Sequence, residues 1–421
     1  MPARASLDTS SLDSLDVIGP DTYMENGYPH AAWKRLRAES PVHWFDLPGG
    51  VGFWAVTRRA DVVWISKQPR RFLNAPRLAV FEEGAPPEKR DIRHLLVMDP
   101  PEHAKFRATA SSWFTPRAIR SRHAEVERIT RELLDEMAGD GETRTADFVN
   151  DLAAPLTLAV LADMLGVPRE DWRLMFHWTN QIAGSSDPEF QSDGIDGSVG
   201  DGITDARDGM FQYFTALSAK RRAQPRNDIV SVLASSTIDG DPMPVMELLS
   251  YFMLLVVAGN ETTRNAASGG LLALIENPGE FDKLRKNPDL VDLAAEEIVR
   301  WTSPVIQFCR TPVEDVEVAG KSIKARDSMC LFYPSANRDE AVFDDPEAFR
   351  VDRKPNPHLG FGIGEHFCLG ASLARLELRA IFGQLAERME EVELAGRYER
   401  TRSSFLGGVK RMPIRYRLRP S

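Results

Sequence analysis

The sequence contains little that would cross-link the chain or carry a structural metal. Only three cysteines occur in 421 residues, Cys309, Cys330 and Cys368, and no two of them form a CxxC pair. An odd number of widely spaced cysteines argues against a disulfide framework and against a structural zinc site. We therefore expect a cytoplasmic protein that folds on its hydrophobic core.

Long apolar runs, a signal peptide and an excess of positive charge are also missing. The longest apolar run, LLSYFMLLVVAG from Leu248, falls short of the roughly 20 residues that span a bilayer, so it predicts a buried helix and no membrane span. Residues 1–20 lack the apolar core of a signal peptide and are expected to form a flexible tail. The net charge of −10 argues against a protein that binds nucleic acid by neutralising phosphates.

Hydrophobic periodicity predicts a mainly α protein with a minor β component. Apolar residues recur at intervals of three and four over 118–137, 152–165 and 245–275, as on one face of a helix. Short alternating stretches at 53–56 and 316–337 favour strands. Residues 185–209 are rich in Gly, Asp and Ser and predict a solvated connection between helices.

The stretch GFGIGEHFCLG, residues 360–370, places a cysteine after spaced glycines and directly before a helical pattern. A dinucleotide-binding loop is a poor interpretation, because the third glycine is out of spacing and a histidine and a cysteine occupy the turn. A thiol nucleophile would need a histidine base and an orienting Asn or Asp, which the sequence alone neither supplies nor excludes.

A metal-ligand role for Cys368 explains more of this stretch. Glycines allow a backbone loop to lie against a flat macrocycle, and the start of a helix carries partial positive charge that stabilises a thiolate. Backbone N–H groups after the cysteine can donate to its sulfur and so adjust how strongly it donates to a metal.

The same stretch resembles the haem-ligand loop of the cytochrome P-450 family. The resemblance covers Phe361, Gly362, Gly364, His366, Cys368 and Gly370. It implies haem b (iron protoporphyrin IX) with the Cys368 thiolate as the only protein ligand to iron. It also implies that residues 21–421 form a single haem-binding domain of the P-450 fold, since further family motifs follow in the expected order.

AGNETT, residues 258–263, lies within the long apolar helix and by itself would only be the polar end of a buried segment. By the resemblance, Glu261 and Thr262 are the acid and alcohol that deliver protons, and Gly259 leaves space beside the helix. Thr262 can hydrogen-bond to the backbone and loosen a turn, which would open a groove for dioxygen.

Two further motifs place charged residues on helix faces. In EEIVR, Glu297 and Arg300 stand three residues apart and can pair. The resemblance implies a buried pair completed by another arginine; Ala348 stands where one often occurs, so Arg350 and Arg353 are both candidates.

In HAKFR, His103 and Arg107 stand four residues apart on one helix face. A His/Arg pair of this kind is more often a surface feature than a functional one. By the resemblance, His103, Arg107, Arg310 and His366 instead donate hydrogen bonds to the two haem propionates.

The resemblance implies a monooxygenase that activates dioxygen and hydroxylates a hydrophobic molecule. Glu261 and Thr262 favour it over a peroxide-using peroxygenase or a haem-based sensor, neither of which needs a proton relay. The best candidate substrate is a sterol or methyl-branched lipid, and a terpenoid or other fused-ring molecule is the alternative. The expected pocket residues are Leu254, Ala258, Val305, Ile306, Phe308, Phe405 and Leu406. Lys89 and Arg93 are candidates for binding a substrate carboxylate.

The expected redox partners are a ferredoxin and an NAD(P)H-dependent ferredoxin reductase. The three cysteines cannot ligate an iron–sulfur cluster, so electrons must come from separate proteins. A basic patch on the cysteine side is expected to receive the ferredoxin. Its candidate residues are Arg117, Arg120, Arg122 and Arg375.

Overall fold

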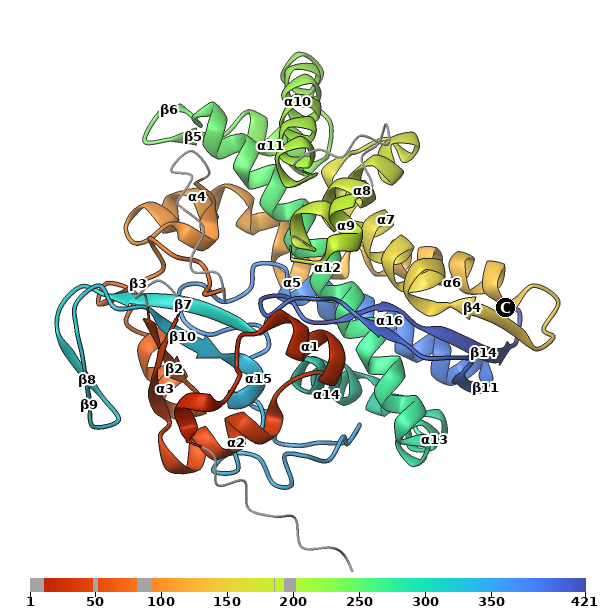
Figure 1. Ribbon diagram of the computed structural model, residues 1–421. Coiled ribbons are helices and arrows are strands. Elements are labelled where there is room, and N and C mark those ends of the chain that lie inside the picture. The colour runs from red at the N-terminus through yellow and green to blue at the C-terminus, as the bar shows by residue number, and fades with distance from the viewer. Residues whose placement is uncertain (1–10, 48–51, 82–92, 185, 193–201) are drawn as a thin grey trace, which may run out of the picture.

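The computed structural model describes residues 11–47, 52–81, 93–184, 186–192 and 202–421. Helices predominate and strands form a smaller part of the fold, which confirms the predicted fold class (Figure 1). The helices are α1 (Pro20–Asn26), α2 (His30–Glu39), α3 (Arg59–Ser66), α4 (Glu102–Ser111), α5 (Pro116–Arg120), α6 (His123–Ala138), α7 (Ala154–Leu165), α8 (Trp172–Ala183), α9 (Pro188–Ser192), α10 (Gly202–Ala223), α11 (Ile229–Ala234), α12 (Val245–Glu276), α13 (Pro278–Lys286), α14 (Val291–Thr302), α15 (Tyr333–Ala336) and α16 (Ala371–Arg388).

The strands form one larger sheet and several small ones. They are β1 (Val42–Asp46), β2 (Gly52–Val56), β3 (Phe72–Leu73), β4 (Arg144–Asp147), β5 (Thr237–Ile238), β6 (Asp241–Pro242), β7 (Gln307–Pro312), β8 (Val316–Val318), β9 (Lys321–Ile323), β10 (Met329–Phe332), β11 (Met389–Leu394), β12 (Glu399–Arg400), β13 (Val409–Arg411) and β14 (Pro413–Leu418). The five-stranded sheet has the order β1-β2-β10-β7-β3, in which only β2 and β10 pair in parallel.

Helix α12 runs through the centre of the molecule and packs against α7, α14 and α16 (Figure 1). A Cβ atom at Gly270 would lie 2.7 Å from Phe382 of α16 and 2.8 Å from Ile298 of α14, so glycine allows both helices to approach closely. Among the described residues, α12 alone is long and apolar enough to cross a membrane, and 56% of its apolar window is buried inside the fold. Its apolar run therefore serves the core.

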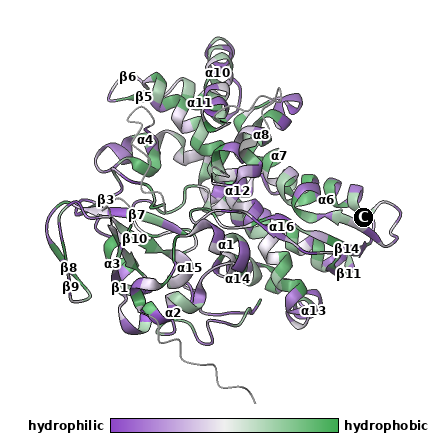
Figure 2. Ribbon diagram, viewed as in Figure 1, coloured by the Kyte–Doolittle hydropathy of each residue, from purple (hydrophilic) through white to green (hydrophobic). Residues whose placement is uncertain are grey.

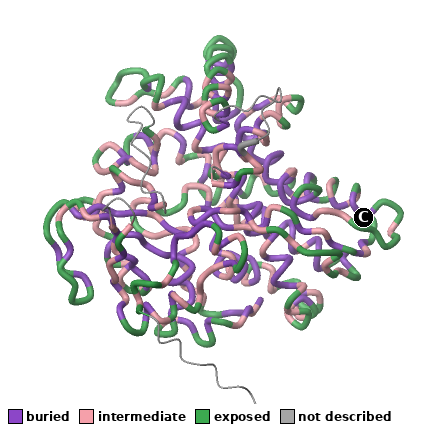
Figure 3. Tube along the Cα trace, viewed as in Figure 1, coloured by how far each residue is buried: buried purple, intermediate pink, exposed green. Residues whose placement is uncertain are grey.

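Most helices carry hydrophobic residues on one side and hydrophilic residues on the other (Figure 2). In α6, for example, Val126, Ile129 and Leu134 are buried, whereas Arg128 is exposed and pairs with Glu125. Exposed residues gather at the periphery, notably on the β8–β9 hairpin and the outer end of α10 (Figure 3).

Three local expectations need correction. Residues 1–10 of the expected tail lie outside the described residues, but residues 11–20 pack against the protein, because Val17 and Ile18 are buried in a cluster with Trp33. The predicted 118–137 helix is divided into α5 and α6. Within the predicted 185–209 connection, α10 already begins at Gly202, since Ala206, Met210 and Phe214 recur at helical spacing and are buried.

Candidate active site

The loop before α16 presents Cys368 to a cavity. The Cys368 N–H donates to the Phe361 carbonyl at 2.9 Å, which closes the loop on itself. Gly362 and Gly364 have positive φ angles of 68° and 82°, a region that favours glycine. A side chain at Gly364 would also collide with the Ser66 carbonyl oxygen. These two glycines therefore permit the loop to take this shape.

The Cys368 thiol is exposed and lines this cavity. Burial raises the pKa of Cys368, whereas backbone hydrogen bonds from Gly370 and Ala371 and the guanidinium groups of Arg107 and Arg375 act to lower it. The backbone N–H groups after the cysteine thus act to favour the thiolate, as the sequence suggested.

The cavity extends from the cysteine loop to the middle of α12. Many of the predicted site residues line it, from four separate parts of the chain. They are His103, Arg107, Leu254, Ala258, Gly259, Thr262, Val305, Phe308, Arg310, Phe361, Gly362, His366, Cys368 and Gly370.

Three predicted pocket residues do not line this cavity. Ile306 is fully buried in the cluster that also contains Cys309 and Trp33, so its side chain is used for core packing. Leu406 pairs with Val305 through a β-bridge and is buried behind it. Phe405 packs against Phe308, with ring centroids 5.7 Å apart, and so supports the wall from outside.

Sequence reasoning missed several residues of the wall. They are Phe114, Leu161, Val299, Tyr333, Leu373 and Leu378. All have the pattern of ordinary core residues, so no local signal distinguishes a side chain that faces a cavity from one that faces another helix.

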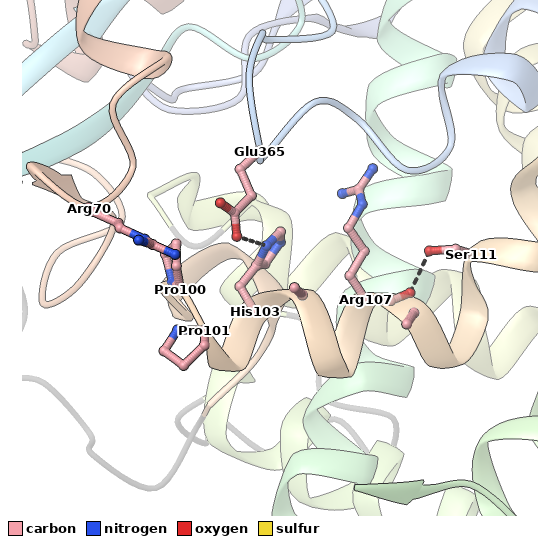
Figure 4. A pocket seen from close by; sticks show the side chains of 9 residues that line it. Arg70, Pro100, Pro101, His103, Arg107, Ser111 and Glu365 are labelled. Carbon is pink, nitrogen blue, oxygen red and sulfur yellow. Dashed lines mark hydrogen bonds and ion pairs between the residues drawn. The ribbon is translucent and has the colours of Figure 1, made fainter. Parts of the chain in front are cut away.

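Four cationic or ionisable donors gather at one side of the cavity. Figure 4 shows His103 and Arg107 on the same face of α4 below the cysteine loop, with Glu365 reaching His103. His103 Nδ1 lies 3.0 Å from Glu365 Oε1, and the His103 and His366 rings are in contact at a tilt of 32°, with centroids 4.0 Å apart. The Nε2 atoms of both histidines are buried and unpartnered among the described residues.

The two arginines of this group bind only neutral acceptors. Arg107 donates to the Phe367 carbonyl at 2.7 Å, and Arg310 donates to the Cys309 carbonyl at 2.7 Å. No carboxylate among the described residues forms an ion pair with either. Burial, with the positive charges of His103, Arg310 and Arg107, lowers the pKa of His366 to about 2. Unpaired donors and excess positive charge at this place fit a ligand that carries carboxylates.

Thr262 and Glu261 face different surroundings although they are neighbours in sequence. Thr262 lines the cavity, and its hydroxyl donates to the Ala258 carbonyl at 2.8 Å, as expected. Glu261 is buried beside the cavity wall and pairs with Arg264, which also donates to Asn180 at 2.8 Å. Burial raises the pKa of Glu261, although Arg264 acts to lower it. Its Oε1 atom has no partner among the described residues.

Gly259 allows α7 to pack closely against α12 at the cavity. A Cβ atom there would lie 3.1 Å from a methyl group of Leu161. Helix α12 is continuous through this turn, so the expected loosening is limited to the hydrogen bond that the Thr262 hydroxyl makes.

The Glu297–Arg300 pair is fully buried beneath the cysteine loop. Arg300 Nε and Nη2 each donate to Glu297 at 2.7 Å. Arg353 completes the group through Nε, 3.0 and 3.1 Å from the two Glu297 oxygens. Arg350 contributes only its backbone N–H, at 2.9 Å, while its side chain is 41% exposed. The structure therefore selects Arg353 over Arg350.

A second ion-pair group braces the other end of the loop. Glu296 accepts hydrogen bonds from Arg375 at 2.5 and 2.9 Å and lies 3.0 Å from His358 Nε2. Burial raises the pKa of Glu296, but the hydrogen bonds from His358 and Arg375 outweigh it and lower the pKa to about 2. Arg375 also stacks over the Phe361 ring at 4.4 Å.

Several of the other predicted arginines are already paired. Arg122 binds Asp163 at 2.9 Å, and Arg375 binds Glu296. The positive charge that these two arginines could offer to a docking partner is therefore partly neutralised. Arg93 pairs with Glu102 and lies 3.6 Å from Glu247. Lys89 lies outside the described residues.

A thiol on a glycine loop, cationic donors and an apolar wall thus surround one cavity, an arrangement that fits a protein with a carboxylate-bearing cofactor beside a cysteine. The family model described as Cytochrome P450 matches residues 65–390. The chain belongs to the cytochrome P450 family, and it is a monooxygenase of that family.

Individual relatives cover nearly the whole chain. It is 38% identical to the methyl-branched lipid omega-hydroxylase of Mycobacterium tuberculosis, over 98% of this chain and 96% of that protein. It is 36% identical to the steroid C26-monooxygenase of Mycolicibacterium smegmatis, over 90% and 89%. The solved structure of Mycobacterium marinum CYP268A2 in complex with pseudoionone is 35% identical, with a TM-score of 0.88, over 97% of this chain and 100% of that one.

Proposed function

We propose that this chain binds haem b through the Cys368 thiolate and hydroxylates a largely apolar lipid. The observation that carries the proposal is the convergence of Cys368 with four donors, His103, Arg107, Arg310 and His366, on one cavity. When bound, a haem with a thiolate ligand supplies reductive activation of dioxygen and insertion of one oxygen atom into the substrate.

The chain's own residues would anchor and serve this cofactor. Arg107 and Arg310 would donate to the propionates, and His103 Nε2 can donate once the ring is protonated, since its Nδ1–H already faces Glu365. Thr262 would hold a proton-carrying water in the cavity, and Glu261 is the nearby acid that could resupply it. The proton relay favours a monooxygenase over a peroxide-using enzyme or a sensor.

A sterol or methyl-branched lipid is the proposed substrate class. Leu254, Ala258, Val305 and Phe308 provide an apolar wall, and the lipid and steroid hydroxylases named above share more than a third of the sequence. Arg93 is paired with acidic residues, which argues against its service as a carboxylate anchor. A terpenoid is the alternative substrate.

A spectral titration of purified protein tests this proposal, because displacement of an iron-bound water shifts the haem absorption. The panel contains a sterol, a methyl-branched fatty acid, a terpenoid alcohol and a small polar aromatic. We expect the tightest dissociation constant for the sterol or the branched lipid. A shift given by the polar aromatic alone would refute an apolar-lipid pocket.

We further propose that the protein is cytoplasmic and receives electrons from an acidic ferredoxin and its NAD(P)H-dependent reductase. Arg117 and Arg120 on α5 are exposed beside the cysteine side of the fold and are the best-placed basic residues. The reduction rate should fall as ionic strength rises. The matched variants are Arg120→Gln, which should weaken the salt dependence, and Arg128→Gln on α6, which should not. A rate indifferent to salt would contradict this docking surface.

A further inference from the structure

Cys309 and Cys330, the two cysteines that the site leaves unused, face each other across two strands. Strands β7 and β10 are antiparallel, and their register pairs Cys330 with Cys309. The Cys309 N–H points away from β10 and donates to the Leu78 carbonyl at 2.8 Å. An amide turned away from the partner strand marks a non-hydrogen-bonded pair, in which the Cα atoms are about 4.5 Å apart and the side chains are close.

That spacing falls within the range of about 4.4 to 6.8 Å that disulfides require between Cα atoms. The strand register sets the two cysteines directly opposite each other. Both belong to the same buried cluster, so they point to the same face of the sheet. A bond between the two sulfur atoms would therefore need no rearrangement of the strands.

We propose that Cys309 and Cys330 form a dithiol that hydrogen peroxide oxidises to a cross-strand disulfide. The sulfur of Cys309 attacks one peroxide oxygen, so that an S–O bond forms, the O–O bond breaks and water leaves. The sulfur of Cys330 then attacks the resulting sulfenic acid, so that the S–S bond forms, the S–O bond breaks and a second water leaves. Two thiols are oxidised and one peroxide is reduced.

The pair lies directly behind the cavity wall. The two sequence neighbours of Cys309, Phe308 and Arg310, both line the cavity. A monooxygenase releases peroxide there whenever reducing equivalents fail to reach product, and this source of oxidant rests on the proposed function. Burial and the neighbouring Cys309 raise the pKa of Cys330. The reaction should therefore be slow.

Gln307 connects the dithiol to two other segments of the chain, at Val80 and Ser404. Its Oε1 atom accepts hydrogen bonds from the Cys330 thiol and from the Val80 N–H. Its Nε2 atom donates to the carbonyls of Val80, at 2.7 Å, and Ser404, at 3.2 Å. The disulfide would remove the thiol hydrogen bond and tie β7 to β10 covalently. We expect the oxidised protein to unfold at a higher temperature, because the link constrains the unfolded chain.

Thiol mapping of the holoprotein tests the proposal. The protein is incubated with added hydrogen peroxide, or with diamide as an oxidant that does not rely on haem chemistry, then denatured, alkylated, digested and analysed by mass spectrometry. We expect a linked peptide pair containing Cys309 and Cys330, lighter by two hydrogens and separated by dithiothreitol.

The controls are Cys309→Ser and Cys330→Ser, each of which should leave the other thiol open to alkylation. If a serine variant fails to fold, the wild-type peptide map still decides the question. Recovery of both wild-type thiols as alkylated peptides, or their separate conversion to sulfonic acids, would overturn the proposal. Because the oxidant is added directly, this result is independent of substrate and turnover.

Discussion

Replacing Arg353 by methionine should destabilise the protein far more than the same replacement at Arg350. The Arg353 side chain is 4% exposed and donates to both oxygens of Glu297, which is fully buried. It also donates to the carbonyls of Asp344, at 2.6 Å, and Ala348, at 2.7 Å. Arg300 still balances the Glu297 charge in the variant, so the cost arises because the Asp344 and Asp345 carbonyls lose their donor. At about 1–3 kcal/mol for each acceptor left unsatisfied, the loss is about 2–6 kcal/mol.

The Arg350 side chain offers a matched control three residues away. It is 41% exposed, and its ion pairs with Asp344 and Asp352 are both 3.8 Å long. An exposed pair of this kind contributes at most about 1 kcal/mol. The backbone N–H of Arg350 that binds Glu297 remains in the variant.

Thermal unfolding measures the difference. An unfolding entropy of about 2.1 cal/mol/K per residue gives about 0.9 kcal/mol/K for 421 residues. Arg353→Met should then lower the unfolding midpoint by about 2–7 °C, and Arg350→Met by about 1 °C or less. Equal losses in the two variants would show that Arg353 does not complete the buried Glu297–Arg300 pair.

Four further predictions concern single side chains. Cys368→Ala should abolish the red-shifted absorption band of the reduced carbon monoxide complex; its persistence would exclude Cys368 as the iron ligand. Thr262→Ala should keep substrate binding but divert reducing equivalents into peroxide, measured as product per nicotinamide consumed; unchanged coupling in this variant and in Glu261→Gln would remove the proton relay. Arg310→Ala should lower haem occupancy after purification, since a propionate loses its charged donor; full occupancy with normal thermal stability would contradict that role. Because the pKa of Glu296 is lowered from 4.5 to about 2, the ionised carboxylate stabilises the fold above about pH 4.5, and this stabilisation is lost as the pH falls toward 2. The difference in unfolding free energy between wild type and Glu296→Gln should therefore shrink between these pH values. A constant difference would contradict the lowered pKa.

Local motifs were readable from the sequence because their geometry is set within one turn or one loop. The glycines at 362 and 364 have the positive φ angles that make them necessary, whatever surrounds them. The hydroxyl of Thr262 reaches the carbonyl four residues earlier in any helix. Likewise, three residues of spacing are enough to bring Glu297 and Arg300 together on α14.

The tertiary structure decides which of several similar residues makes a given contact. Arg350 and Arg353 are equivalent in sequence, and only the path of the chain after α15 buries one of them against Glu297. Val305 and Phe308 reach the cavity while Ile306 does not, because Ile306 packs into the neighbouring hydrophobic cluster instead. Cys309 and Cys330 are twenty-one positions apart, and their contact exists only because β7 and β10 pair in one register. Sequence spacing constrains neighbours along the chain, whereas contacts between distant segments follow from packing and strand register, which no short motif encodes.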